Sequence, residues 1–152
     1  MLDTSLIGRV LGRRTIAVER GAVRAFAQAT GETNPVYFDE AVAQAAGLRS
    51  LRVPATFLSS LERQIFPSRE LVELTGLNTQ RVLHAEQSYV YHAAACAGDM
   101  LTYEPRIAEI YDKKNGAMSF LVKETRVCTQ EGQHVADLRT TWVQKNAIED
   151  RP

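Results

Sequence analysis

The sequence predicts an α+β fold in which a long antiparallel β-sheet wraps around one central α-helix. Two observations predict it. Apolar residues recur at helical spacing in the first half of the chain, while the second half holds four long alternating segments separated by glycine-containing turns. An apolar helix followed by consecutive long strands is typical of this class. The 152 residues suit a single domain. We place it at residues 1–146 and expect residues 147–152 to form a polar tail.

Two shorter helices are expected first. In residues 19–29 the apolar side chains fall on one face, and Gly31 follows as a helix stop. Asp39 is a favourable N-cap for a short helix that ends at Gly47.

The central helix is predicted to begin at Pro54, because proline is favoured in the first turn. Pro67 ends it. Its apolar residues fall at i, i+1, i+4 and i+8, which indicates one broad buried side: Phe57, Leu58, Leu61 and Ile65.

Four strands of about ten residues are predicted to follow. Asn115-Gly116 marks a tight hairpin between the second and third. Pro105 predicts a bulge or an edge position. Simple alternation along the first strand places His84 and Glu86 on one face. The predicted ranges are 82–92, 101–111, 117–128 and 133–144.

The composition excludes several classes of function. Lysine plus arginine and aspartate plus glutamate each number 18, so the basic excess of a nucleic-acid binder is missing. Cys96 and Cys128 form neither a disulfide framework nor a zinc pattern. No histidine pair has metal-ligand spacing, so we predict no metal and no cofactor. No apolar run reaches the ~20 residues of a membrane span, and the first residues do not resemble a signal peptide. We therefore expect a cytoplasmic protein.

The segment 31–37, Gly-Glu-Thr-Asn-Pro-Val-Tyr, forms a loop between two helices. It resembles the hydratase motif of MaoC-type (R)-specific enoyl thioester hydratases, Gly-Asp-x-Asn-Pro-hydrophobic-His. Two further stretches resemble the FAS1-like dehydratase branch of that family, namely 52–57 and 83–92, the latter followed by the Gly-Asp turn in 97–101. The resemblance runs from about Ile7 to Val143 and implies a single hot-dog fold.

The departures from the motif decide the expected role. In catalytic members the motif Asp and His activate a water that adds to, or leaves from, C3 of the acyl thioester. Here Glu32 and Tyr37 occupy those positions, on either side of Asn34. A phenol is a poor base at neutral pH, and a misplacement of about 1 Å can cost about 100-fold in rate. The motif positions Glu32, Asn34 and Tyr37 thus resemble those of a degenerate half that pairs with a catalytic MaoC-type chain.

Further site residues follow from the same resemblance. The start of the central helix faces the thioester carbonyl in the family, and its free N–H groups favour developing negative charge. We expect substrate to bind at Pro54, Ala55, Thr56, Phe57 and, on the first strand, Gln87. His84 is the alternative catalytic base, although a strand histidine beside a glutamate is more often structural.

The resulting hypothesis is a subunit of an (R)-3-hydroxyacyl thioester dehydratase, or 2-enoyl thioester hydratase. It would bind an acyl-CoA or acyl-carrier-protein thioester and form a homodimer or a heterodimer. Three alternatives remain open at this point. They are a self-sufficient homodimeric hydratase that uses Glu32 and Tyr37 or His84, a hot-dog thioesterase, and an acyl-binding module without turnover.

Overall fold

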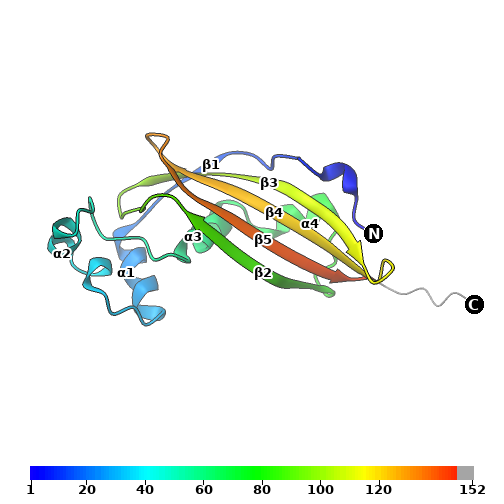
Figure 1. The fold of residues 1–152 in the computed structure, drawn as a ribbon, viewed down its shortest axis with the longest axis horizontal. Coiled ribbons are helices and arrows are strands. Elements are labelled where there is room, and N and C mark those ends of the chain that lie inside the picture. The colour runs from blue at the N-terminus through cyan, green and yellow to red at the C-terminus, as the bar shows by residue number, and fades with distance from the viewer. Residues whose placement is uncertain (147–152) are drawn as a thin grey trace, which may run out of the picture.

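A computed structural model of the protein describes residues 1–146 (Figure 1). The predicted polar tail, residues 147–152, lies outside the described residues. The elements, in chain order, are η1 (Thr4–Leu6), β1 (Arg14–Ala17), α1 (Arg20–Ala29), η2 (Pro35–Tyr37), α2 (Glu40–Ala45), α3 (Phe57–Ile65), α4 (Ser68–Thr75), β2 (Val82–Tyr91), β3 (Met100–Lys113), β4 (Met118–Thr129) and β5 (His134–Lys145).

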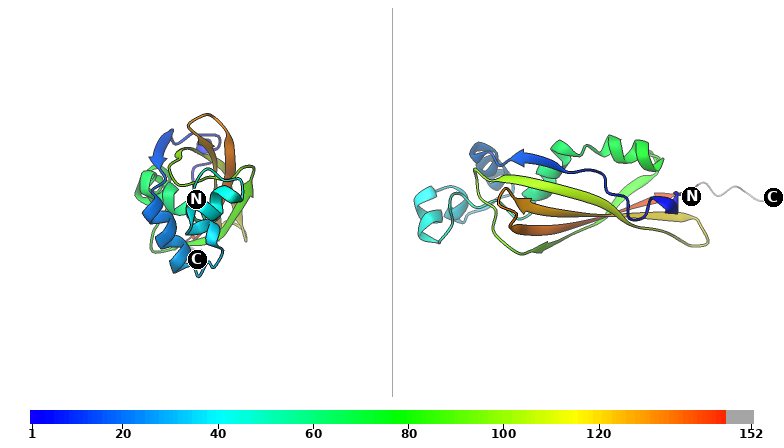
Figure 2. Two further views of the ribbon diagram at one scale, coloured as in Figure 1. Left: turned by 90° about the vertical axis from the view of Figure 1, so that its left-hand side faces the viewer. Right: turned by 90° about the horizontal axis from the view of Figure 1, so that it is seen from above.

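The strands form one antiparallel sheet in the order β1-β3-β4-β5-β2. The helices α3 and α4 cover one side of it, while α1 and α2 gather beyond one end (Figure 2). β2 pairs only with β5 among the described strands and forms an edge of the sheet. The predicted α+β class and the sheet around a central helix are confirmed.

The core lies between α3 and the sheet. Phe57, Leu58 and Leu61 of α3 are buried in one cluster with side chains of β3, β4 and β5, among them Leu101, Tyr103, Val127 and Leu138. The second, smaller cluster lies under α4 and includes Leu71, Leu77, Ile107 and Leu121. The apolar face that the spacing predicts for the central helix is thus the face that packs against the sheet.

The start of α3 differs from the prediction. The helix begins at Phe57, three residues after Pro54, and residues 54–56 form a turn that leads into it. In that turn the Phe57 N–H donates to the Pro54 carbonyl at 3.0 Å. Thr56 is the N-cap residue, but its side chain does not cap the helix. Pro54 therefore lies in the turn before α3 and not in the first turn of the helix itself.

The turn chemistry of the second half is confirmed in part. Asn115 and Gly116 have φ values of 54° and 85°, and the Ala117 N–H donates to the Lys114 carbonyl, as in a type I′ hairpin turn. Pro105 lies in regular register opposite Thr125, and the bulge of β3 falls at Ala108 instead. Since β1 pairs only as far as Tyr103, the missing N–H of Pro105 removes no hydrogen bond between these two strands.

Among the described residues, no helix combines the length and the apolar character that crossing a bilayer requires. Cys96 is buried and Cys128 is half-buried, and both thiols are free.

Candidate functional site

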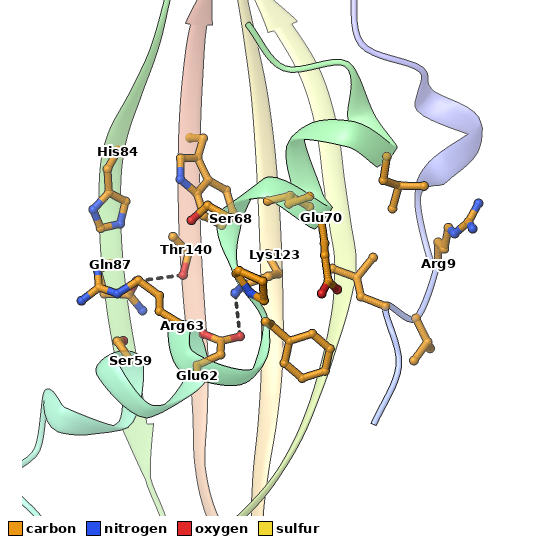
Figure 3. A pocket seen from close by; sticks show the side chains of 17 residues that line it. Arg9, Ser59, Glu62, Arg63, Ser68, Glu70, His84, Gln87, Lys123 and Thr140 are labelled. Atoms are coloured by element: carbon orange, nitrogen blue, oxygen red, sulfur yellow. Dashed lines mark hydrogen bonds and ion pairs between the residues drawn. The ribbon is translucent and has the colours of Figure 1, made fainter. Parts of the chain in front are cut away.

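Two cavities of about 320 Å³ each lie along α3. The first, the motif cavity, lies between the motif loop, the segment before α3 and the end of β2. The second, the helix cavity, lies between α3, α4 and the sheet (Figure 3). Leu58 lines the motif cavity and the next residue, Ser59, lines the helix cavity. Both volumes fall in the range of small-molecule sites.

The motif cavity brings together three of the predicted site residues, Tyr37, Pro54 and Ala55. Tyr37 lies 17 positions before Pro54 in the sequence, and backbone hydrogen bonds join the segments that line the cavity. The Arg52 N–H donates to the Val36 carbonyl at 3.0 Å, and the Val53 N–H donates to the Ala95 carbonyl at 2.9 Å. The remaining lining residues are Arg52, Val53, Leu58, Tyr91, His92, Ala93, Ala94, Ala95 and Val135.

Asn34 shapes the motif loop instead of lining the cavity. Its side-chain oxygen accepts from the Val36 N–H at 3.1 Å and so caps the short 3-10 helix η2, in which Pro35 is the first residue. An Asn-Pro pair is well suited to this role, because asparagine caps a helix start and proline has φ preset for its first turn. The cap holds Tyr37, the last residue of η2, at the cavity.

Glu32 is half-buried but does not line the motif cavity. It follows Gly31, whose φ of 75° ends α1 in the left-handed region. The Glu32 N–H then donates to the Ala27 carbonyl at 2.9 Å. The backbone of Glu32, the residue at the carboxylate position of the motif, therefore belongs to the C-terminal cap of α1. Tyr37, at the histidine position, lines the cavity.

The turn before α3 contains two free backbone donors, and one of them belongs to a residue that lines the same cavity, while Thr56 does not line it. Among residues 1–146, the amides of Ala55 and Thr56 donate to no protein acceptor. Both residues are exposed, and Ala55 lines the cavity. Unpaired N–H groups at a helix start stabilise negative charge on a bound ligand. Phe57, in contrast, lies in the core, where its ring packs on Phe26 at a centroid distance of 4.8 Å.

The helix cavity contains the other two predicted residues, His84 and Gln87. The Gln87 side-chain oxygen accepts from the Thr140 hydroxyl at 2.8 Å, as Figure 3 shows. Its amide nitrogen makes only a 3.5 Å contact with the Ser88 carbonyl. The apolar part of the lining comes from the N-terminal segment, the link between α3 and α4, α4 and β5: Val10, Leu11, Phe66, Pro67, Leu71, Leu74 and Trp142.

A buried ion pair in the helix cavity was missed by the sequence reasoning. Glu62 on α3 is 3% exposed and Lys123 on β4 is 8% exposed. Lys123 Nζ lies 2.6 Å from Glu62 Oε1, which also accepts from the Thr125 hydroxyl at 2.5 Å. The ammonium also lies 5.6 Å from the centre of the Trp142 ring. Glu62 follows the buried Leu61 on the inner face of α3, and this position was the available signal.

The negative charge of Glu62 has an effect on its neighbour Tyr103. Burial raises the pKa of the Tyr103 phenol well above its usual value, and the charge of Glu62 raises it further. The hydroxyl donates to the Leu58 carbonyl at 3.1 Å. Tyr103 is therefore a neutral hydrogen-bond donor inside the core.

A β-bulge decides which side chains of β2 reach the helix cavity. His84 lies opposite Trp142 and Glu86 lies opposite Thr141, so Ala85 is the extra residue. Cross-strand partners share a face, which places His84 with Trp142 and Gln87 with Thr140 on the cavity side. The expectation that His84 and Glu86 share a face is therefore wrong, because the bulge rotates the strand between them.

The sheet wrapped around one helix, with a cavity where that helix begins, defines a hot-dog domain. The chain belongs to the FAS1-like dehydratase domain family, because the family model described as "FAS1-like, dehydratase domain region" matches residues 5–138. The predicted resemblance and the hot-dog fold are thus confirmed.

Individual proteins agree with this membership. A UPF0336 protein of Clavibacter michiganensis is 32% identical over 143 residues, which cover 93% of this chain and 95% of the relative. The truncated HadBC (3R-hydroxyacyl-ACP dehydratase) complex of Mycobacterium tuberculosis contains a chain of similar fold. Its TM-score is 0.78 and its identity is 24%, and the match covers 91% of this chain and 96% of that one. A MaoC-like dehydratase matches with a TM-score of 0.77 and 23% identity, over 94% of this chain but 43% of its own.

Proposed function

We propose that the protein is the acyl-binding subunit of an (R)-3-hydroxyacyl thioester dehydratase, or 2-enoyl thioester hydratase, and that it pairs with a catalytic MaoC-type chain. One observation carries the proposal. At the motif cavity the family's histidine position holds Tyr37, while Glu32 does not line that cavity. The cavity therefore lacks the motif's acid–base pair but keeps groups that can hold a substrate.

The thioester end of the substrate is assigned to the motif cavity. The amide of Ala55 lies in the turn before α3 and has no protein acceptor among the described residues, so it is available to a carbonyl oxygen bound in this cavity. Such donors bind a thioester and stabilise the enolate-like charge that develops on it. They do not by themselves move the proton at C2 or the water at C3, which is the part left to the partner.

The acyl chain is assigned to the helix cavity. Leu58 and Ser59 are adjacent on α3, so a chain that crosses this turn leads from one cavity into the other. Apolar lining residues such as Leu71, Leu74 and Trp142 offer contact area for methylene groups. The polar groups of Gln87 and of the Glu62–Lys123 pair would favour chains that also carry a hydrogen-bonding group.

The partner is assigned to the open edge of β2. This strand is ten residues long, pairs with β5 on one side, and exposes Leu83, Val90 and Tyr91 at 63%, 58% and 47%. Long apolar edge strands are normally protected or paired. A strand of a second subunit would satisfy the edge and continue the sheet. The HadBC chain of similar fold belongs to a complex of two proteins.

The test is hydration of crotonyl-CoA, followed by loss of the enoyl absorbance. The chain alone, a MaoC-type chain with an intact Gly-Asp-x-Asn-Pro-x-His motif alone, and their equimolar mixture are compared. We expect turnover in the mixture well above the sum of the separate chains. Full activity of this chain alone would contradict the proposal. In that case Glu32→Gln, Tyr37→Phe and His84→Ala identify the group responsible.

A matched pair of variants tests the interface. Val90→Lys places a charge on the exposed edge of β2 and is expected to abolish both the complex and the gain in activity. Ile7→Lys, at another exposed apolar residue that lies outside this edge and lines neither cavity, is the control. Retained complex formation by Val90→Lys, measured by light scattering after gel filtration, would place the interface elsewhere.

A further inference from the structure

At the border of the motif cavity, which His92 lines, two imidazoles and a carboxylate converge at one end of β5. His92 Nε2 lies 2.8 Å from Asp137 Oδ2, and His134 Nε2 lies 2.9 Å from Asp137 Oδ1. The two rings stack with centroids 4.1 Å apart. The ligand atoms of all three side chains lie within 4.8 Å of one another. Their side chains are 28–47% exposed, so an ion from solution can reach them.

A bulge in β5 creates this cluster. In β5, His134 lies opposite Cys128 and Ala136 lies opposite Val127, so Val135 is the extra residue. Without it, residues three apart in a strand would point to opposite faces. With it, His134 and Asp137 share one face.

The same bulged residue also positions the third ligand. The Val135 carbonyl accepts from the His92 N–H at 2.8 Å and from the Ala93 N–H at 3.2 Å. Val90 lies opposite Asp137, and His92 follows two positions later on that face. One carbonyl of β5 therefore fixes the end of β2 beside the other two side chains.

From this geometry we propose that His92, His134 and Asp137 form a binding site for a transition-metal dication, with Zn²⁺ as the reference ion. Two imidazole nitrogens and one carboxylate oxygen are a donor set that Zn²⁺ accepts, with solvent completing four-coordination. In a tetrahedral site with bonds of about 2.0–2.1 Å, ligand atoms are about 3.3 Å apart. The two nitrogen–oxygen separations, 2.8 and 2.9 Å, run to different oxygens of Asp137, so the side chains must move apart by about 0.5 Å to admit the ion.

The charges around the cluster are few among the described residues. The Asp137 carboxylate is its anionic ligand, and each of its oxygens lies beside one of the two imidazoles. Arg126 is its cross-strand partner on β4, and it is exposed, so its long side chain can extend into water when a cation binds.

The site is tested with the metal alone. The full chain is freed of metal with a chelator and titrated with ZnCl₂ by calorimetry, and with CoCl₂ by visible absorbance. We expect one equivalent to bind, with the d–d bands of a four-coordinate Co²⁺ ion. His134→Ala and Asp137→Asn should each weaken binding by about tenfold or more. His84→Ala is the control: it removes another exposed histidine, from β2 but away from the cluster, and should leave the affinity for the metal unchanged.

Thermal unfolding provides a second measurement. Zn²⁺ is expected to raise the melting temperature of the wild-type chain, because it binds the folded state, and to have no such effect on Asp137→Asn. Because this comparison uses only the wild-type chain and Asp137→Asn, it still tests the site if His134→Ala does not fold. The proposal is overturned if the wild-type chain binds neither ion saturably, or if His84→Ala weakens binding as much as Asp137→Asn does. In either case the cluster is a hydrogen-bonded His–Asp–His group without a metal.

Discussion

The buried Glu62–Lys123 pair allows the strongest quantitative prediction. Its two side chains are only 4% and 10% exposed, and their charged atoms are 2.6 Å apart. Lys123→Met keeps most of the volume but removes the ammonium, which leaves the Glu62 carboxylate with the Thr125 hydroxyl as its remaining donor. Breaking one side of a buried pair typically costs about 3–5 kcal/mol in the free energy of unfolding. For a chain of this size that corresponds to a fall in melting temperature of about 6–20 °C.

The assay is thermal and urea unfolding followed by circular dichroism. Lys145→Met, which removes an exposed lysine from the end of β5, is the control and should change stability by less than about 0.5 kcal/mol. The double variant Glu62→Met/Lys123→Met removes both charges, so it should be more stable than Lys123→Met alone. The reasoning is refuted if Lys123→Met costs less than about 1 kcal/mol, or if the double variant loses the sum of the two single losses.

Three further predictions concern single contacts. Tyr103→Phe removes the buried hydrogen bond to the Leu58 carbonyl and should cost about 1 kcal/mol in urea unfolding; an unchanged midpoint would contradict that bond. Hydrogen bonds from Arg14 hold the pKa of Glu70 below its ordinary value of 4.5, so this pair stabilises the fold above about pH 4.5 and the contribution is lost as the pH falls further; Glu70→Gln should flatten that acid dependence. Gly116→Ala forces alanine to a φ of 85° and should cost about 1 kcal/mol in the same measurement, although no neighbouring atom blocks a Cβ.

Much of the fold could be predicted because the local signals agree with the tertiary packing. The apolar stripe of the central helix coincides with its contact with the sheet, and the Asn115-Gly116 pair forms the hairpin that its backbone freedom favours. Asp39 caps α2 by accepting from the amides of Ala41 and Val42, as its side chain predicts. These features depend on residues close together in the chain.

The parts of the site that depend on distant residues could be predicted less well. The motif Asn34-Pro35 indicated a loop, but which of its side chains reach the cavity depends on the cap of α1 and on the bond between Arg52 and Val36. The ion pair of Glu62 joins residues 61 positions apart, and no periodicity in either segment indicates the other. Sequence patterns thus located the site along the chain, but not the pairing of its charges.

The bulges of β2 and β5 show why alternation alone misplaces functional side chains. Each inserts one residue, Ala85 in β2 and Val135 in β5, and each moves every following side chain to the other face relative to simple alternation. An alternating sequence tolerates such a slip only where the residues on both sides still suit the faces that they reach. Here the slip turns Gln87 toward the helix cavity and His134 toward Asp137. Because a bulge is set by pairing with a neighbouring strand, the residues that it brings together can be recognised only once that pairing is known.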